Sequence, residues 1–306
     1  MMRWLAVLLL IGCETPAMGT DAAVSDTGPR IDAARVIDAG GDAPAIDVPI
    51  DARAAIDTGP VIAMRPVIVA AGSNHARWLS IDEGLTWCDV RDVVPSTTDF
   101  DNPNLLRNIT YANGRFVTGS WTAIFSSTNG YEWTDVTAGA GPAFHQWVAQ
   151  IDYGNGWWVA TGGYGQAMRS HDLTTWEVTS SSLGGTQASR ELAFGAGMFV
   201  TARDSVGWWS SADGTGWTQL DATAGTGVRF ENGMFVAPPD YDHGRGIRLS
   251  NGWPHDIRRS DDVDGATFTR VATLDETPLH FAFGEAPAAD YAPGRVPSAL
   301  ASCLGL

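Results

Sequence analysis

The stretch Ser80-Ile81-Asp82-Glu83-Gly84-Leu85-Thr86-Trp87 is the most informative part of this 306-residue chain, because four variants of it follow. We name the five copies boxes 1 to 5; they are residues 80–87, 127–133, 170–176, 211–217 and 260–268. The aromatic residues that close them are 46, 43, 41 and 51 residues apart. A repeat of this length predicts an architecture in which one supersecondary unit is used several times.

The residues shared by the boxes predict a tight turn. A serine hydroxyl and an aspartate carboxylate can hydrogen-bond backbone amides across such a turn, and glycine supplies a positive φ. The closing aromatic side chain is expected to be buried between neighbouring units. Box 3 has no glycine at this position. The structural box residues are Ser80, Asp82, Gly84, Trp87, Ser127, Asn129, Gly130, Trp133, Ser170, Asp172, Trp176, Ser211, Asp213, Gly214, Trp217, Ser260, Asp262, Gly265 and Phe268.

A second pattern precedes each of boxes 2 to 5. It is an apolar alternation, a glycine turn and then an aromatic residue and valine, with copies at residues 113–117, 155–159, 196–200 and 232–236. Asn-Gly between alternating segments is the strongest short-range signal for a hairpin. Each unit therefore reads as four strands. In the second unit we expect them near residues 108–112, 115–118, 123–126 and 131–136.

The composition agrees with many short strands joined by turns. The chain has 35 glycines and 16 prolines, and 44% of its residues are hydrophobic, which is enough apolar surface for a core. The formal net charge of −16 argues against nucleic-acid binding. Metal ligation by Asp240, Asp242 and His243, or by the acidic run 261–264, is an alternative. We expect no cofactor and no resident metal.

Together, the boxes resemble the Asp-box, or BNR repeat, of sialidase-like β-propellers. The resemblance covers residues 61–306 and implies an all-β propeller of four-stranded blades. The first unit lacks its opening strand, and residues 279–284 are expected to supply it, so that the N- and C-terminal strands of the domain pair in one sheet. This arrangement favours five blades. Six blades would require a contribution from residues 285–306 or from a diverged segment.

The cysteines are consistent with this closure. The chain has three, Cys13, Cys88 and Cys303. An exported protein can keep a disulfide, and a bridge between Cys88 and Cys303 would lock the C-terminal tail onto the blade that the closing strand completes. The alternative is two unpaired thiols, one of them reactive.

The N-terminal residues read as a targeting signal. Met1-Met2-Arg3 precedes a short apolar run that ends at Gly12-Cys13, and this run is too short to span a bilayer. It resembles the bacterial lipoprotein signal. The resemblance implies a signal peptide over residues 1–12 and lipidation of Cys13. The alternative is an ordinary signal peptide with a chance cysteine.

Residues 13–60, with Cys13 as the lipid anchor, are predicted to be a disordered Asp/Ala/Pro-rich tether. Aspartate recurs every four to six residues from Asp21 to Asp57, and no aromatic residue is present. Such a composition cannot bury enough apolar surface to fold. The tether is similar to those of myxobacterial lipoproteins. It implies an exported protein anchored by lipid to the bacterial cell envelope, with the outer membrane or cell surface favoured and the inner membrane left open.

Ligand binding is expected on one face of the propeller. The loops after strands two and four of each blade share a face around the central channel, and loops commonly carry binding residues. Arg190 reaches this face from the loop 181–190. The competing interpretation is that the arginines form salt bridges or point into solvent. The predicted ligand-binding residues are Trp121, Tyr164, Arg203, Asp204, Tyr241, Asp242, His243 and Arg245, and the last four of these belong to a long loop expected over residues 238–246.

These observations predict a non-catalytic, membrane-anchored binding or scaffolding module. It is expected to be a monomer with a glycan or an envelope protein as its ligand. The alternative is a secreted glycoside hydrolase of sialidase-like type acting on envelope or extracellular glycans. A sialidase needs an arginine cluster, an acid and a tyrosine nucleophile, and its Arg-Ile-Pro segment is here Met64-Arg65-Pro66-Val67, without the isoleucine. Catalytic residues stay unassigned.

Overall fold

A computed structural model describes residues 61–91, 105–120, 123–136, 147–180, 183, 188–222, 227–231, 234–236, 242–244, 247–252, 255–261 and 267–306. The chain divides into two units, residues 1–57 and 58–306, and all described residues belong to the second. The predicted signal peptide, Cys13 and the tether lie outside the described residues. Within the described ranges, no helix is both long and apolar enough to cross a membrane.

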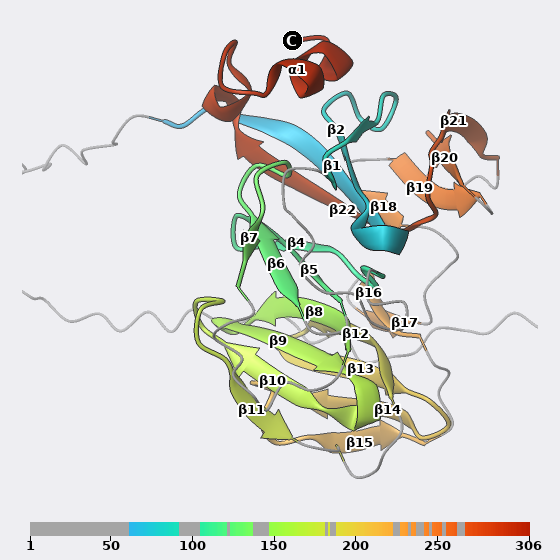
Figure 1. The fold of residues 1–306 in the computed structure, drawn as a ribbon. Helices are drawn as coiled ribbons and strands as arrows, with labels where there is room; N and C mark the ends of the chain where they lie inside the picture. Colours follow the sequence, from blue (N-terminus) through green and yellow to red (C-terminus); the bar gives the residue numbers. More distant parts are fainter. Residues whose placement is uncertain are drawn as a thin grey trace, which may run out of the picture. The chain divides into compact units, whose positions relative to one another are not determined.

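The described part of the second unit consists mainly of five four-stranded antiparallel sheets, which we name A to E (Figure 1). Sheet A contains β22 (Pro278–Pro287), β1 (Met64–Gly72), β2 (Arg77–Ser80) and β3 (Cys88–Asp89). Sheet B contains β4 (Thr110–Ala112), β5 (Arg115–Gly119), β6 (Ile124–Ser127) and β7 (Thr134–Asp135). Sheet C contains β8 (Val148–Gly154), β9 (Trp157–Gly162), β10 (Ala167–Ser170) and β11 (Glu177–Ser180).

Sheet D contains β12 (Ser189–Gly195), β13 (Met198–Arg203), β14 (Gly207–Ser211) and β15 (Thr218–Asp221), and sheet E contains β18 (Asp242–Gly244), β19 (Ile247–Gly252), β20 (Asp256–Ser260) and β21 (Thr269–Thr273). A two-stranded hairpin, β16 (Arg229–Glu231) with β17 (Met234–Val236), lies between them in the sequence. The helical segments are short: η1 (Ser73–His75), η4 (Gly163–Gly165), η5 (Ala288–Tyr291) and α1 (Ser298–Leu304).

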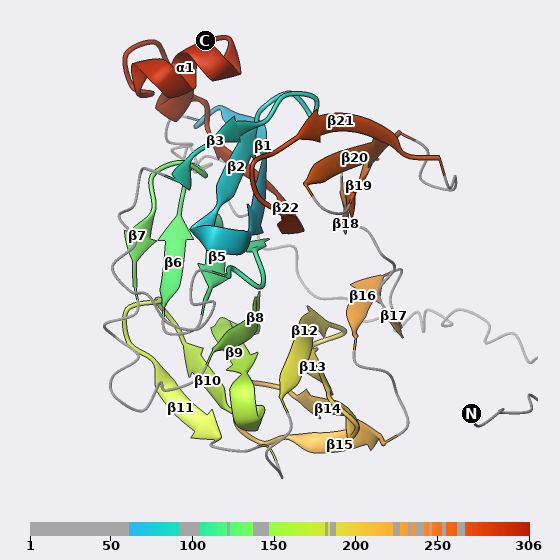
Figure 2. The same ribbon diagram turned by 45° about the vertical axis from the view of Figure 1, so that its right-hand side comes forward.

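Successive sheets contact one another through their first strands (Figure 2). Strand β22 of sheet A contacts β4 of sheet B, β4 contacts β8 of sheet C, β8 contacts β12 of sheet D, and β12 contacts β16 of the hairpin. Strand β18 of sheet E contacts β22 and so returns to the first sheet. Repetition of one four-stranded antiparallel unit with this connectivity is the architecture of a β-propeller. The predicted fold class is confirmed.

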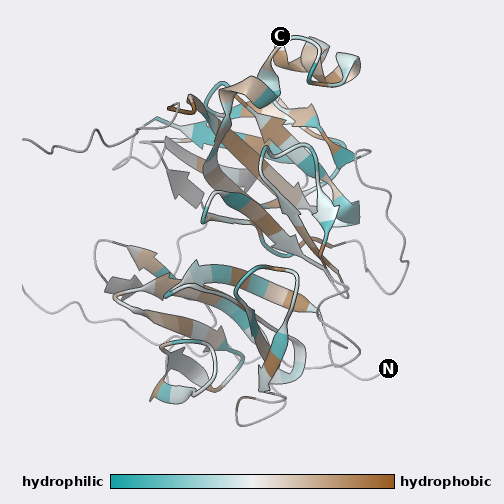
Figure 3. Cartoon of the chain, turned by 90° about the vertical axis from the view of Figure 1, so that its left-hand side faces the viewer, coloured by the Kyte–Doolittle hydropathy of each residue, from teal (hydrophilic) through white to brown (hydrophobic). Residues whose placement is uncertain are grey.

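The core consists of layers between neighbouring sheets. Alternate residues of a strand point to opposite faces of its sheet, and both faces of β1 are buried. Val67 and Val69 pack into a cluster with Phe116 of sheet B, whereas Ile68 packs with Leu249 of sheet E. Figure 3 shows hydrophobic residues distributed along the strands of the sheets. A sheet in this fold is therefore apolar on both faces, which explains why its strands read as nearly continuous hydrophobic runs.

The N- and C-terminal strands of the domain close sheet A. Strand β22 pairs antiparallel with the whole of β1, from Met64 opposite Pro287 to Gly72 opposite Pro278. The prediction that residues 279–284 supply the missing opening strand is confirmed. Closure of this kind removes a free strand edge at the point where the ring of sheets begins and ends.

The fifth unit differs from the sequence-based prediction. The hairpin signal at residues 232–236 was expected to join the first two strands of this unit, with a loop over residues 238–246 after them. These strands form the separate β16–β17 hairpin instead, and sheet E begins at β18. The sequence continues from β17 into Pro238-Pro239, and proline cannot donate to a strand ladder. Among the described residues there are five four-stranded sheets, and the hairpin adds a sixth unit, which agrees with the alternative of six blades that include a diverged segment better than with the favoured count of five.

The hairpin continues the packing pattern of the sheets. An added Cβ on Gly195, at the end of β12, would collide with the ring of Phe230 in β16. In the same way, Gly154 at the end of β8 lies against the ring of Phe194, and Gly284 of β22 lies against Tyr111. The β16–β17 hairpin therefore takes the position of a further, incomplete unit after sheet D.

The boxes form the turns between the third and fourth strands of sheets A to D. In box 1, the Ser80 Oγ accepts the Gly84 N–H at 2.9 Å, the Asp82 Oδ1 accepts the Thr86 N–H at 2.9 Å, and the Trp87 Nε1 donates to the Gly84 O at 2.9 Å. The same three kinds of bond recur in boxes 2, 3 and 4. In box 5, Ser260 is buried, whereas Asp262 and Gly265 lie outside the described residues.

The backbone of the turns follows the sequence. The hairpin turns at Asn113-Gly114, Asn155-Gly156 and Ala196-Gly197 have positive φ at both residues, as type I′ turns require. The box glycines Gly84, Gly130 and Gly214 also have positive φ, between 81° and 84°. In box 3 the corresponding position is Leu173, with φ of 66°. A leucine thus adopts a left-handed conformation that elsewhere belongs to glycine.

The C-terminal segment is fixed to sheets A and B. Cys88 of β3 and Cys303 of α1 form a disulfide with a Cα–Cα distance of 5.9 Å, which confirms the predicted bridge. The ring of Tyr291 packs edge-on against Tyr131 of box 2, and its hydroxyl donates to the Asn129 O. Leu300 of α1 is buried in the same cluster as β1 and β5. The tail is therefore a packed part of the domain.

Candidate functional site

The predicted ligand-binding residues fall into three groups. Trp121, Tyr241 and Arg245 lie outside the described residues. Asp242 and His243 are described only as backbone: they form β18 and pair with Leu249 and Arg248 of β19. Their expected position in a long loop is therefore wrong, because the chain begins a new sheet there. Tyr164, Arg203 and Asp204 are fully described, and these three lie where the sequence placed them, at the ends of second strands or in the turns that follow.

Tyr164 and Arg203 have different environments. Tyr164 occupies the middle of the η4 turn with φ of 53°, and 57% of its surface is exposed. Arg203 ends β13 and is 1% exposed. Its guanidinium donates to the Leu183 O and lies 5.4 Å from the ring of Trp209. Tyr164 is thus available to a ligand, whereas Arg203 is buried and binds the backbone at Leu183.

A cluster of arginine and tryptophan lies on the predicted face. Arg107, Trp147 and Arg190 occur where the chain enters the first strands of sheets B, C and D. The Cζ of Arg107 is 4.6 Å and that of Arg190 is 5.5 Å from the Trp147 ring centroid. The Arg190 Nε makes an ion pair with the Asp204 Oδ2 at 2.8 Å. We name these four residues the arginine–tryptophan cluster.

The charges in the cluster are not balanced. Burial lowers the pKa of Arg107, and the nearby positive charge of Arg190 lowers it further. Among the described residues, Asp204 is the one carboxylate in an ion pair with the cluster, and it is paired with Arg190. Two guanidinium groups therefore share one aromatic ring and one carboxylate. Because like charges repel at this range, the cluster favours an additional anion.

Backbone contacts within the units of sheets C and D hold the cluster in place. The Gly163 N–H donates to the Trp147 O at 3.0 Å, and the Asp204 N–H donates to the Ala188 O at 3.1 Å. A Cβ on Gly162 would overlap the Trp147 O, a backbone atom that cannot move aside cheaply. The turn that carries Tyr164 therefore fits against the residue that carries the tryptophan ring only because position 162 is glycine.

A small cavity lies beside Trp147. Its volume is about 10 Å³, room for about one water molecule, and Trp147, Thr161, Gln166 and Met168 contribute to its lining. The Thr161 Oγ1 is buried without a hydrogen-bond partner in the described part of the chain. A buried hydroxyl in this condition usually has a water or ligand group nearby. The cavity adds to the cluster a small recess that is mostly apolar and contains one buried hydroxyl group.

One carboxylate on an inner strand has an unusual pKa. Asp152 of β8 accepts the Tyr153 N–H at 2.8 Å and, across the junction with sheet D, the Phe194 N–H at 2.7 Å. Burial raises the pKa of Asp152 to about 6, although both hydrogen bonds act to lower it. Both oxygens are occupied by backbone donors, so Asp152 joins two sheets.

Arg107 and Trp147 were missed by the sequence analysis, whereas Arg190 was recognised as a residue of this face. Alignment of the units at their hairpin turns could have found Arg107, because Arg107 and Arg190 each lie six residues before the first residue of such a turn. Trp147 has no counterpart in that alignment. Its contribution depends on how sheets B, C and D pack together.

Comparisons with known proteins add little to these findings. No family model matches the chain, and a search of curated proteins finds no match. Solved structures that resemble it include YCF48 bound to D1 peptide (15% identity, TM-score 0.44, 68% of this chain and 80% of that chain), an ancestral GH74 enzyme (13%, 0.41, 67% and 29%) and the mitotic checkpoint complex (11%, 0.37, 69% and 62%). Strand pairing itself places the chain among β-propeller proteins.

Proposed function

We propose that this chain is a lipoprotein of the bacterial envelope that presents an Asp-box β-propeller as a binding module for an anionic ligand. The N-terminal pattern ending at Cys13 supports the anchor, and the composition of residues 13–60 supports a spacer. The repeated hydrogen bonds of boxes 1 to 4 support the Asp-box assignment. The arginine–tryptophan cluster supports the choice of ligand.

The choice of an anionic ligand rests on Arg107 and Arg190, whose two positive charges are matched by one carboxylate among the described residues. The chain as a whole has a formal charge of −16, so a local excess of positive charge stands out against its surroundings. Guanidinium groups bind carboxylate, phosphate and sulfate through paired N–H donors. A ligand anion between the two arginines would replace the missing counter-charge, while Trp147 offers an apolar surface and Tyr164 an exposed hydroxyl-bearing ring.

Binding of simple anions by the full chain in detergent tests the ligand class. We expect phosphate, sulfate and glucuronate to bind saturably at low ionic strength and to weaken as salt is added. Arg107→Gln and Arg190→Gln should each reduce the affinity at least tenfold. Arg115→Gln, which changes an exposed arginine on a hairpin turn, is the control. Equal affinity in all variants would contradict the proposal.

The anchor has a separate test. Mass spectrometry of the purified protein should find an N-terminal peptide that begins at an acylated Cys13, and Cys13→Ser should release the protein from the membrane fraction. A non-acylated N-terminus elsewhere in residues 1–60 would remove the anchor from the proposal and leave the binding module unaffected.

Glycoside hydrolysis is the second candidate, because Asp152 is a carboxyl group with a raised pKa on an inner strand, a feature of general acids. A panel of fluorogenic glycosides, including a sialoside, tests it. Turnover that disappears in Asp152→Asn would replace the binding module with an enzyme. We expect no turnover, since both carboxylate oxygens are held by backbone amides.

A further inference from the structure

The opposite ends of the strands of sheet C carry a second group of aromatic and charged side chains. Trp157 begins β9, and Arg169 and His171 lie two residues apart on β10 and just after it. The rings of Trp157 and His171 are stacked with centroids 3.3 Å apart, and the Arg169 Cζ is 3.8 Å from the Trp157 ring centroid. The His171 Nδ1 is 2.8 Å from the Gly156 O. These contacts hold the indole in one orientation.

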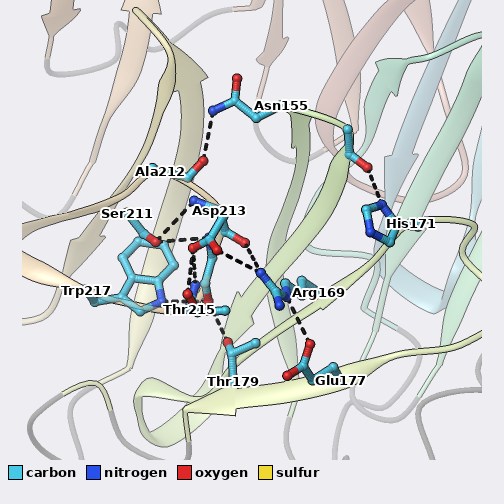
Figure 4. Close-up of polar contacts among 12 residues, drawn as sticks. Asn155, Arg169, His171, Glu177, Thr179, Ser211, Ala212, Asp213, Thr215 and Trp217 are labelled. Carbon is cyan, nitrogen blue, oxygen red and sulfur yellow. Dashed lines mark hydrogen bonds and ion pairs between the residues drawn. The ribbon is translucent and has the colours of Figure 1, made fainter.

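Two ion pairs also hold Arg169, one within sheet C and one with sheet D (Figure 4). The Arg169 Nε is 3.0 Å from the Glu177 Oε2, and its Nη1 is 2.9 Å from the Asp213 Oδ2 of box 4. The Asn155 Nδ2 donates to the Gly197 O and the Ala212 O, each at 2.9 Å. The side chains are therefore ordered before any ligand arrives, which lowers the entropic cost of binding.

A groove lies over these side chains. It has a volume of about 290 Å³, and its lining includes Trp157, Arg169, His171, Thr175 and Glu177. The side chain of Arg169 is only 15% exposed, whereas that of Glu177 is 60% exposed. The groove thus combines an aromatic surface with a rim of hydroxyl, carboxylate and imidazole groups. Its volume lies at the lower limit of small-molecule sites, which suits a single sugar residue.

The charges select the class of ligand. Arg169 is neutralised by Glu177 and Asp213, so the groove has no free positive charge for an anion. The carboxylate of Asp172 already accepts the Thr174 and Thr175 N–H groups at 2.8 and 3.0 Å. The groups that remain for a ligand are the Glu177 carboxylate, the Thr175 hydroxyl and the His171 ring. That mixture suits a neutral molecule with many hydroxyl groups and one apolar face.

We propose that this groove binds a neutral sugar residue of a glycan. The His171 ring and the Arg169 guanidinium cover the two faces of Trp157, so the apolar face of a pyranose ring packs on the exposed outer face of His171. The hydroxyl groups of the sugar donate to Glu177, and the Thr175 hydroxyl completes the hydrogen bonds. The groove lies at the box ends of the strands, whereas the arginine–tryptophan cluster lies at their other ends. The two sites are independent, and the chain would hold a neutral and an anionic group at once.

Isothermal titration of the full chain with glucose, N-acetylglucosamine, cellobiose and chitobiose tests the proposal. We expect at least one of these saccharides to bind saturably, with an affinity insensitive to salt. Glu177→Gln and Thr175→Ala should each weaken binding at least tenfold. Thr86→Ala makes the matching change in box 1, outside the groove, and Arg190→Gln alters the arginine–tryptophan cluster; neither should change saccharide affinity.

Three outcomes would overturn the proposal. The first is the absence of saturable binding by every saccharide in the panel. The second is binding that Glu177→Gln and Thr175→Ala leave unchanged. The third is salt-sensitive binding of a lysine-rich peptide that these variants abolish, which would assign the groove to a cationic ligand. Failure of the anion test with intact saccharide binding would remove only the proposed anion site.

Discussion

At the scale of single residues, box 3 shows how a turn can change its composition without changing its shape. Leu173 has the positive φ that glycine provides in the other boxes, yet the Leu173 N–H still donates to the Ser170 Oγ at 2.9 Å. Its side chain is buried with Val117 and Ile124 of sheet B. In boxes 2 and 4 a Cβ would be crowded by side chains of the preceding sheet. Packing against the neighbouring sheet compensates for the strained backbone.

Leu173→Gly should therefore destabilise the protein, although it restores the residue found in the other boxes. Truncating a buried leucine costs about 2–5 kcal/mol, whereas relief of the left-handed conformation returns about 1–2 kcal/mol. We expect a net loss of about 2 kcal/mol in the free energy of unfolding, measured with urea. A stabilised variant would show that backbone strain dominates at this position.

Asp152 should make stability depend on pH. Its pKa is raised from 3.8 to about 6 in the folded protein, so the folded state binds a proton more tightly than the unfolded state. Stability from this group is highest at low pH and falls as pH rises from about 4 to 6. The total loss is about 3 kcal/mol at 1.36 kcal/mol per pKa unit.

Asp152→Asn removes this titration. Relative to the wild type, the variant should become more stable by up to about 3 kcal/mol as pH rises from 4 to 7, whatever the fixed cost of losing one acceptor. Urea unfolding at several pH values measures the difference. A difference that stays constant with pH would contradict the role given to Asp152.

At the scale of elements, short local signals decide where strands begin and end. The Asn-Gly turns join first and second strands, and the boxes join third and fourth strands. Both are determined by hydrogen bonds and φ values within a few residues. Strand β18, which the sequence misplaced, has no such signal. Strand β18 begins in a segment that reads as a polar, glycine-rich loop, and only pairing with β19 identifies it as a strand.

Gly162→Ala should disturb the arginine–tryptophan cluster through the backbone. A Cβ at this position overlaps the Trp147 O, so β8 or the η4 turn has to move. We expect lower stability by about 1–3 kcal/mol and loss of anion binding beyond what partial unfolding explains. Gly216→Ala, in open space, is the matched control. Unchanged anion affinity in a folded Gly162→Ala variant would show that the η4 turn does not position the anion-binding residues.

At the scale of the whole domain, closure depends on residues from the two ends of the sequence. Strand β22 completes sheet A beside β1, and the Cys88–Cys303 disulfide joins residues 215 positions apart. Each sheet covers the apolar face of the next, so a sheet without its neighbours would expose a large hydrophobic surface. The disulfide between the first sheet and the C-terminal helix restricts the unfolded chain strongly, because the loop that it closes is long.

Removal of the disulfide should reduce stability more than removal of any single surface interaction. In the chain-entropy model, a loop of this length stabilises by about 5 kcal/mol. We expect the double variant Cys88→Ser/Cys303→Ser to unfold at a clearly lower temperature. Reductant should lower the melting temperature of the wild type and leave the double variant unchanged. Equal melting temperatures of wild type and variant under oxidising conditions would show that the bridge does not contribute to stability.

The binding sites could be predicted from the sequence only in part. The loop face was identified because strands two and four of every blade end there, and Arg190 was placed on it. Tyr164 and Asp204 were also named. The pairing of Arg107 with Arg190 around Trp147 was not foreseen, and neither was the stacking of Trp157 on His171. Each of these groupings requires a distance between two strands that no local pattern specifies.

The repeated unit and its turns could be predicted from sequence, because they depend on hydrogen bonds, backbone conformation and periodicity within short segments. The closing strand and the Cys88–Cys303 pair could be predicted because the first unit lacks a strand and the resemblance to β-propellers implies closure of the ring. Only the tertiary structure decided which charges share a surface, why Leu173 is tolerated, and where the fifth sheet starts. Those features depend on how neighbouring sheets pack. Packing brings together side chains that are 40 or more residues apart, such as Arg107 with Trp147 and Trp147 with Arg190.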